Sequence, residues 1–367
     1  MCMDKRSRHK AYCQLREEIR GSREYLIVGI DISKDRHHAF FGTAGGKTVY
    51  KKFVFENSYK GFTKLIDHAK AMMAQHGLIK IVFGLEPTGD YHKPLANFLI
   101  TNGFALVLVS GVALKRNREL LDNRWDKNDV KDSANIADLI SQGKCLFYEY
   151  PSYEILTLRS LLSLRKRLKV EMHGVRMRIR NNLIAKHFPE MDRHYNEACI
   201  GIVRWTLDPK KISSMDFDSF FKMTSSNWRQ EKRFRLIYDC ARHSIGLSVD
   251  KGAEYDAMVL TTRCTELAKS IKEVEGRIEE TAKGFDEYKY LLTIPGFGPY
   301  ISAVVLASIG TLQFSSRSQI IKMAGLDLSA SRSGKTSDNA TPVISKKGKS
   351  ELRYALYQAA IIASKDG

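Results

Sequence analysis

Two apolar runs with the pattern of buried β-strands each contain one acidic residue, and this feature restricts the fold most. Asp31 lies within the run 25–32, and Glu86 closes the run 79–86. A lone carboxylate in a buried strand is costly unless it is paired or bound to a ligand. Each of these two acids therefore needs a partner in the folded protein.

A second acidic feature lies downstream, in a segment with the apolar spacing of a helix. Asp129 and Asp132 stand three residues apart there, so both carboxylates project from one helix face. Such a pair on its own usually lies on a solvated face. Together with the two strand acids, it indicates a site for a cation.

The order of the predicted elements narrows the fold. Strands are expected at 25–32, 37–42, 47–55, 79–86 and 104–109, with helices at 58–75, at 91–101 and up to about 142. Alternation of helices and strands is typical of α/β domains in general. Three strands followed by alternating helices and strands is the order of the ribonuclease H-like fold. The places of the acids, in the first strand, at the end of the fourth and on the last helix, favour that fold.

The charge balance indicates a polyanionic partner. The 367 residues include 59 Lys and Arg against 41 Asp and Glu, which gives a net charge of +18 and a pI near 9.5. Nucleic acid is the simplest such partner, and a basic membrane-surface protein is the competing class. No apolar run approaches the roughly 20 residues that span a bilayer.

Simpler features indicate the cellular compartment and the number of domains. The first residues lack the apolar core of a signal peptide. Six scattered cysteines without a C-x-x-C pair argue against zinc fingers and disulfide frameworks, and for a reducing cytoplasm. The length allows two or three domains.

Residues 150–286 are expected to form a long helical, coiled-coil region. A basic helix is predicted over 155–188, with its apolar side at Leu161, Leu164, Leu168, Met172, Val175, Ile179 and Leu183. A heptad seam predicts a second helix over 252–284, which would pair either with the first or with another subunit. Between them, 190–250 has the character of a small helical insertion.

Several basic segments are candidates for nucleic-acid contact. The excess of bases on the helix 155–188 favours phosphate contact over a solvated face. The candidates there are Arg165, Lys166, Arg167, Lys169, Arg176, Arg178 and Arg180. Residues 1–23 form a basic N-terminal extension, which is either frayed or an arm that contacts nucleic acid.

The C-terminal region, 287–367, is expected to be small and mainly helical. Gly296 and Gly298 form a tight turn between two helical segments. Their backbone N–H groups either face a phosphate, as in helix-hairpin-helix DNA binders, or the turn serves packing alone. Further basic candidates for nucleic-acid contact are Arg332, Lys335, Lys346, Lys347 and Lys349.

Short motifs in both end regions carry a resemblance to a known family. The blocks GIDISK at 29–34, EPTGDY at 86–91 and NDVKDSA at 128–134 resemble those of the RuvC-like DEDD domain of insertion-sequence transposases, now understood as bridge-RNA-guided recombinases. AGLD at 324–327, SGK at 333–335 and ISKKGK at 344–349 are similar to the second domain of these transposases. Leu328 stands where proline is frequent in relatives, and Lys349 where asparagine is frequent.

The resemblance implies an architecture and a chemistry. The fold would be α/β plus all-α, with a ribonuclease H-like (RuvC-like) domain at 24–146 and a C-terminal transposase domain at 287–367. Asp31, Glu86, Asp129 and Asp132 would hold one or two Mg²⁺ ions at the scissile phosphate. Ser333 would be the nucleophile and form a phosphoserine ester with DNA. Arg332 and Lys335 beside it would stabilise the phosphoryl charge.

The resemblance also implies partners. These are donor and target DNA, a structured guide RNA that pairs with both, and further copies of the chain in a dimer or tetramer that completes the site, in the bacterial cytoplasm at the nucleoid. Two other functions stay open on the residues alone. One is a metal-dependent, structure-specific endonuclease such as a Holliday-junction resolvase, which uses the acids without Ser333. The other is a non-catalytic nucleic-acid scaffold.

Overall fold

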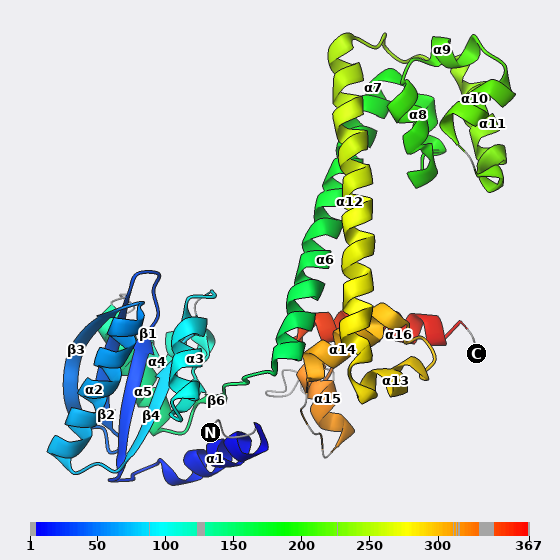
Figure 1. The fold of residues 1–367 in the computed structure, drawn as a ribbon. Helices are drawn as coiled ribbons and strands as arrows, with labels where there is room; N and C mark the ends of the chain where they lie inside the picture. Colours follow the sequence, from blue (N-terminus) through cyan, green and yellow to red (C-terminus); the bar gives the residue numbers. More distant parts are fainter. Residues whose placement is uncertain are drawn as a thin grey trace. The chain divides into compact units, whose positions relative to one another are not determined.

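The chain divides into two compact units, Met1–Tyr150 and Pro151–Gly367. The computed structural model describes residues 5–87, 89–122, 129–225, 227–310, 312, 314, 316–329 and 341–365. The first unit is a mixed α/β sheet with helices, and the second is mostly helical (Figure 1). This agrees with the α/β plus all-α organisation predicted from the sequence.

A six-stranded sheet forms the centre of the first unit, in the order β3-β2-β1-β4-β5-β6. The strands are β1 (Tyr25–Asp31), β2 (Arg36–Thr43), β3 (Thr48–Glu56), β4 (Lys80–Leu85), β5 (Ala105–Leu108) and β6 (Leu146–Phe147). The strands β1, β2 and β3 pair antiparallel, whereas β4 is parallel to β1 and β5 is parallel to β4. The first five strands confirm the predicted ones. The two-residue β6, antiparallel to β5, is too short to leave a sequence pattern.

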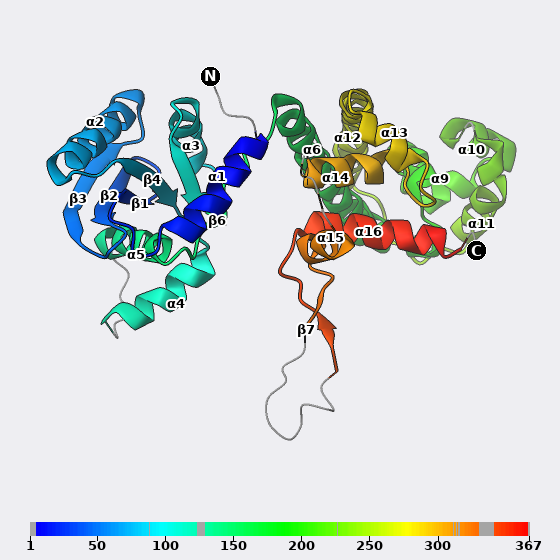
Figure 2. The ribbon, with the colours of Figure 1, turned by 90° about the horizontal axis from the view of Figure 1, so that it is seen from below.

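Helices cover both faces of the sheet (Figure 2). On one face, α2 (Tyr59–His76) and α3 (His92–Thr101) bury Phe62, Leu65, Leu95 and Leu99 against β1 and β4. On the other, α5 (Asp129–Ser141) buries Ile136 and Ile140 against Ile27 and Val82. α4 (Gly111–Asp122) adds Leu114 to this second core. Because both faces are covered at the centre of the sheet, β1 and β4 carry near-continuous apolar runs.

The basic N-terminal segment is a docked helix rather than a frayed end. α1 (Lys5–Glu18) buries Leu15, and Ile19 just after it, in the core that α5 also lines. Three arginines of this segment donate to main-chain carbonyls: Arg8 to Tyr148, Arg16 to Gly143 and Arg20 to Gln142. The sequence alone did not predict this docking, because two apolar side chains among many bases carry little helical pattern.

Two long antiparallel helices form the axis of the second unit (Figure 1). α6 (Tyr153–Arg178) continues through a π-helical turn, Ile179–Ile184, into α7 (Ala185–His187), and α12 (Lys251–Lys283) packs along α6. The predicted heptad seam is buried throughout, at Ala257, Leu260, Cys264, Leu267, Ile271, Val274 and Ile278. The partner of this seam is therefore α6 of the same chain.

The first turns of α6 differ in detail from the predicted helix. Ile155, Leu158 and Leu162 are buried there, whereas the predicted Leu161 and Leu164 are only partly buried. Both sets are apolar, so periodicity alone does not choose between them. The choice depends on α14, which packs against this end of α6.

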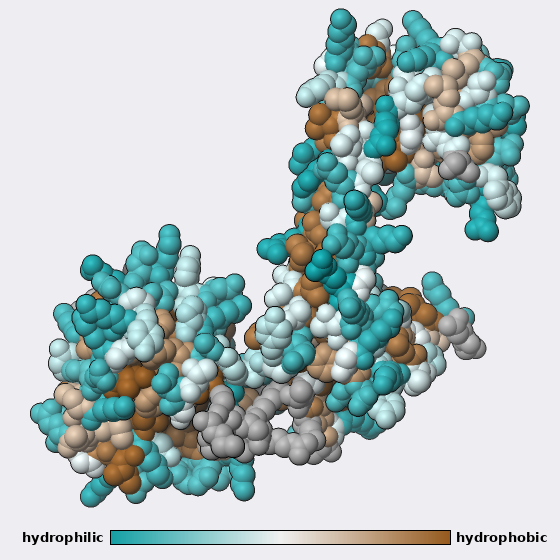
Figure 3. Space-filling view, viewed as in Figure 1, coloured by the Kyte–Doolittle hydropathy of each residue, from teal (hydrophilic) through white to brown (hydrophobic). Residues whose placement is uncertain are grey.

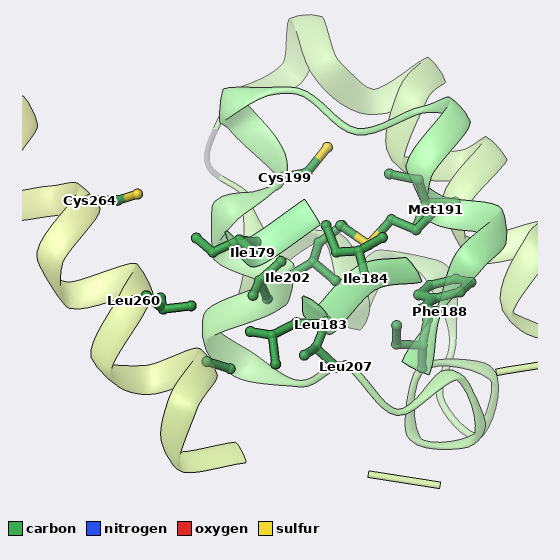
Figure 4. Close-up of a cluster of buried hydrophobic side chains, with 14 of the residues drawn as sticks. Ile179, Leu183, Ile184, Phe188, Met191, Cys199, Ile202, Leu207, Leu260 and Cys264 are labelled. Carbon is green, nitrogen blue, oxygen red and sulfur yellow. The ribbon is translucent and has the colours of Figure 1, made fainter. Parts of the chain in front are cut away.

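The described residues of the segment 190–250 form short helices. Its helices are α8 (Ile200–Trp205), α9 (Pro209–Ser213), α10 (Phe217–Thr224) and α11 (Glu231–Ala241). Figure 4 shows its core, in which Ile202 and Leu207 meet Ile179 and Leu183 from the π-helical turn and Leu260 from α12. The insertion thus packs on the end of the helix pair as well as on itself.

The C-terminal part contains α13 (Asp286–Leu292), α14 (Pro299–Ile309), α15 (Arg317–Ala324) and α16 (Ser350–Ala363), with a short antiparallel pair β7 (Leu328–Ser329) and β8 (Val343–Ile344). α14 is buried from Ile301 to Ser308, because α16, α6 and α12 surround it. None of the described helices is both long and apolar enough to cross a membrane. On the face shown in Figure 3, both units carry mostly hydrophilic residues with smaller apolar areas interspersed.

Candidate active site

Asp31 and Glu86 lie side by side at the carboxyl ends of the parallel strands β1 and β4. Ile30 pairs with Leu85 in the register of these strands, and each acid is the next residue along. Both acids are partly buried. Because side chains alternate along a strand, Asp31 shares a sheet face with Gly29. The fold therefore brings two acids that are distant in sequence to one edge of the sheet.

Gly29 and Gly84 identify that face as the one under α5. A Cβ at Gly29 would overlap the carbonyl oxygen of Ser133, and a Cβ at Gly84 would overlap the side chain of Ile140. Glycine in a strand interior is typical of such a close backbone approach. α5 is thus seated directly on β1 and β4, on the face of the sheet to which Asp31 and Glu86 belong.

Asp132, one residue before this contact, is almost completely buried, with 1% of its surface exposed. Its Oδ1 accepts hydrogen bonds from Nε of Arg118 at 2.9 Å and from Nη2 at 2.6 Å. A buried carboxylate requires such a charged partner. The sequence reasoning missed Arg118, because only the packing of α4 on α5 brings it to Asp132.

A buried amide network holds α4 against α5. Asn117 donates from Nδ2 to Oδ1 of Asn135 at 2.7 Å and to Oδ2 of Asp138 at 2.8 Å. Asn135 in turn donates from its own Nδ2 to the carbonyl of Leu114 at 2.8 Å. Because buried polar groups are costly without partners, this network fixes the register of the two helices.

The amino end of α4 lies against Glu86. A Cβ on Gly111 would overlap Oε1 of Glu86, so this carboxylate reaches the first turn of the helix. The helix dipole favours a negative charge at that end. α4 therefore touches two of the predicted acids, Glu86 at its start and Asp132 through Arg118.

The four predicted metal-site residues are acids, and carboxylate oxygens are the ligands that hard divalent cations prefer. Asp129 is the first residue of α5, and its side chain is outside the described part of the structure. Among the described residues, no three acidic, histidine or cysteine side chains gather closely enough to hold a metal ion. Asp31 and Glu86 thus belong to one edge and face of the sheet, and Asp132, on the helix over that face, is bound by Arg118.

Most of the predicted basic residues on α6 and its continuation pair with carboxylates of the same unit. The pairs are Arg165 and Lys169 with Glu275, Lys166 with Glu351, Arg176 with Glu197, and Arg180 with Asp192. Arg167 and Arg178 are exposed. The pairs of Lys166, Lys169 and Arg180 are exposed, and exposed ion pairs contribute only about 0–1 kcal/mol, so a phosphate can replace their carboxylates. The basic side chains of α6 nonetheless carry less unpaired positive charge than the sequence of the helix alone indicates.

In the C-terminal part, Gly296 serves packing. Its φ is +82°, and a Cβ there would overlap the carbonyl of Ala359 on α16. Gly298 caps α14 with open space around its α-carbon. Lys349 donates from Nζ to the carbonyl of Ser308 at 2.6 Å. Lys346 and Lys347 are exposed, and the predicted residues Arg332, Ser333 and Lys335 lie outside the described residues.

Comparison with known proteins is consistent over both units. Residues 28–189 match the DEDD domain of IS110 transposases, described as a transposase, and residues 288–366 match the domain described as "Transposase IS116/IS110/IS902 family". The chain is also 23% identical over 323 residues to the "Insertion element IS116 uncharacterized 44.8 kDa protein" of Streptomyces clavuligerus, an alignment that covers 86% of this chain and 79% of that protein.

An α/β unit with an acidic edge, followed by a helical unit, and both matched by transposase domains, defines a DNA transposase. The chain belongs to the IS116/IS110/IS902 family of transposases. DNA is therefore a partner, and the DEDD domain implies dependence on a divalent metal ion. The resemblance to insertion-sequence transposases seen in the sequence motifs is confirmed at this level.

Proposed function

We propose that this transposase is a DNA recombinase that combines a Mg²⁺ site in a ribonuclease H-like (RuvC-like) domain at 24–146 with a serine nucleophile in the domain at 287–367. The helical region 150–286 joins the two. The observation that supports the proposal is that Asp31 and Glu86 end adjacent parallel strands, while α5, which carries Asp129 and Asp132 in its sequence, is seated on the same face of the sheet. The antiparallel β1–β3 followed by parallel β4 and β5 supports the ribonuclease H-like assignment.

The acids Asp31, Glu86, Asp129 and Asp132 would hold one or two Mg²⁺ ions. When bound, such ions polarise the scissile phosphodiester and neutralise the charge that develops on it. The chain's own part is to keep the carboxylates together without mutual repulsion. Arg118 and the amino end of α4 serve this purpose at Asp132 and Glu86.

Ser333 would attack the phosphorus of a DNA phosphodiester. A bond forms between its Oγ and phosphorus as one backbone P–O bond breaks, the hydroxyl proton passes to a base, and the leaving DNA oxygen takes up a proton. The resulting phosphoserine ester conserves the bond for later rejoining. Arg332 and Lys335, on either side of Ser333 in the sequence, would stabilise the phosphoryl charge.

The partners of this reaction are donor and target DNA, a structured guide RNA and further copies of the chain, in a dimer or tetramer. The net charge of +18 supports nucleic-acid partners. RNA pairing also supplies sequence specificity without a recognition helix. We expect RNA of defined sequence to co-purify with the protein from its host. Recombination of DNA by a nucleic-acid-free preparation would exclude the guide.

Trapping of a covalent intermediate tests the chemistry. A cleavage substrate that cannot be rejoined should yield a protein–DNA adduct that survives denaturation, and peptide mapping should place the adduct on Ser333. The Ser333→Ala variant should lose the adduct and recombination but still bind nucleic acid, whereas Ser337→Ala should keep both. Metal-dependent cutting to free ends by Ser333→Ala would instead establish a resolvase-like nuclease that uses the acids alone. Binding without cutting under all metal conditions would leave a scaffold.

A further inference from the structure

We propose that Arg118 is a positioning residue that acts as the counter-cation of Asp132 in the metal-free protein and sets how much a divalent cation stabilises the acidic site. This inference rests on the metal site proposed above. Arg118 belongs to none of the motifs that carry the family resemblance. Its assignment comes from the packing of α4 on α5.

Burial makes the pair strong. The side chains of Asp132 and Arg118 are 2% and 16% exposed. Both guanidinium donors bond the same oxygen, Oδ1, so the contact is directed at one edge of the carboxylate. Removal of one partner from a buried pair leaves the other charge uncompensated, which is strongly destabilising.

Hydrogen bonds of the neighbouring residue fix the position of Arg118 relative to α5. Arg118 follows Asn117 directly, and Asn117 is tied to Asn135 and Asp138 of α5. Lys115 and Arg116, the other bases of α4 nearby, are exposed. Arg118 is thus the basic residue of α4 that the amide network presents to the acidic edge.

A divalent cation at this edge and Arg118 compensate the same carboxylate charge. In the absence of the metal ion, Arg118 does so alone. With the metal ion bound, its contribution falls, because two cations near one carboxylate repel each other. Loss of Arg118 should therefore destabilise the metal-free protein much more than the metal-loaded protein, and binding of the metal should stabilise the variant more than the wild type.

The test compares melting temperatures of the full chain in EDTA and with saturating Mn²⁺ or Mg²⁺. For Arg118→Met in EDTA we expect a fall of about 5 °C or more. The rise on addition of Mn²⁺ should be at least about twice that of the wild type, if metal and guanidinium compensate the same charge. Arg118→Lys keeps the charge, so its melting temperature in EDTA and its rise with Mn²⁺ should lie between those of the wild type and Arg118→Met. Arg116→Met, which removes an exposed charge from the same helix, should behave like the wild type in both conditions.

Two outcomes for Arg118→Met would decide against the inference. An equal loss with and without Mn²⁺ would make Arg118 a structural residue only, and an unchanged melting temperature in EDTA would show that it is not the counter-cation. If Arg118→Met folds only when Mn²⁺ is present, the inference is supported. Calorimetric titration of the wild type separates the two proposals, since failure to bind Mn²⁺ or Mg²⁺ overturns the metal site itself and this inference with it.

Discussion

The main-chain carbonyl oxygen of Ser133 lies where a Cβ on Gly29 would have to be. At this point α5 is seated on β1, with Asp132 one residue before the contact on the helix and Asp31 two residues beyond it on the strand. The relative position of these two acids thus depends on the absence of a side chain at residue 29. Gly29 lies within the first motif, where the sequence gives no sign of a structural role. By allowing the close contact with Ser133, it determines where α5 and its acids lie.

Substitution of Gly29 by alanine should displace α5 from the sheet. The new methyl group would meet backbone rather than a flexible side chain, so we expect a loss on the order of 3 kcal/mol in the free energy of unfolding, measured by urea denaturation. Binding of Mn²⁺ should weaken as well. Gly45→Ala is the matched control, because a Cβ there meets only Thr43 Oγ1 at 3.9 Å. Wild-type stability and recombination in Gly29→Ala would contradict this account of the site.

Neutralisation of either strand acid should abolish recombination without unfolding the protein. Asp31→Asn and Glu86→Gln keep the shape of the side chain but remove the charge that a divalent cation requires. We expect recombination of plasmid substrates to fall by on the order of a hundredfold or more. The circular dichroism spectrum should not change. Asp35→Asn, at an exposed position between β1 and β2, serves as the control, and full activity in either acid variant would rule out the metal site.

Much of the fold follows from local pattern. The seam from Ala257 to Ile278 is buried as its heptad spacing predicts, because two helices that meet along their length preserve that spacing. The apolar runs around Asp31 and Glu86 are β1 and β4, and both carry their acids to one edge. That edge was predictable because parallel strands joined by a helix end on the same side of a sheet.

The missed features depend on contacts between distant segments. The docking of α1 uses Leu15 and a few arginine–carbonyl bonds to residues 142–148, which no periodicity reveals. The pair of Arg118 with Asp132 needs the α4–α5 register that Asn117 and Asn135 fix. Likewise, the excess of bases on α6 overstated its free charge, because the carboxylates that balance it come from elsewhere in the unit.

Arg165 and Arg167 on α6 should separate stability from nucleic-acid binding. Arg165 pairs with Glu275 and stacks on the ring of Tyr300, with 3.7 Å from its guanidinium carbon to the ring centroid. Arg165→Ala should therefore reduce the free energy of unfolding by about 1–2 kcal/mol. Nucleic-acid affinity should change little. Chemical denaturation and filter binding measure the two effects.

The matched variant Arg167→Ala should behave in the opposite way. Arg167 is exposed, and in the described parts of the chain nothing bonds its side chain. If it contacts a phosphate, its loss should reduce affinity for RNA or DNA and lower the slope of log affinity against log salt by about 1. Stability should stay within about 0.5 kcal/mol of the wild type. If both variants bind as the wild type does over a range of salt, α6 is not a phosphate-binding surface.

His37 should make the first unit sensitive to acid. Its imidazole has no exposed surface and lies against the rings of Phe55 and Phe62. Burial lowers the pKa of His37 in the folded protein, and Nδ1 accepts a hydrogen bond from the backbone N–H of Ser33, as a neutral ring does. The unfolded chain has the ordinary histidine pKa of about 6.5.

The sign of the effect follows from proton uptake. Above about pH 6.5 both states hold His37 neutral, so its contribution to stability is complete. As the pH falls below that value, the unfolded chain binds a proton that the folded protein refuses. The free energy of unfolding should then decrease by up to about 1.4 kcal/mol per pH unit, until the lower folded-state pKa is reached. Urea denaturation at intervals from pH 7 to pH 5 measures this slope.

His37→Gln removes the titrating ring and keeps a hydrogen-bond acceptor, so its slope should be shallower whatever its absolute stability. Burial also lowers the pKa of His68, which is stacked on Phe53. Part of the pH dependence of stability should therefore remain in His37→Gln. The double variant His37→Gln/His68→Gln should therefore have the shallowest slope of the three. Equal slopes in the wild type and His37→Gln would mean that His37 binds a proton as readily in the folded protein as in the unfolded chain. Nδ1 of the ring would then not accept the hydrogen bond from Ser33 in solution.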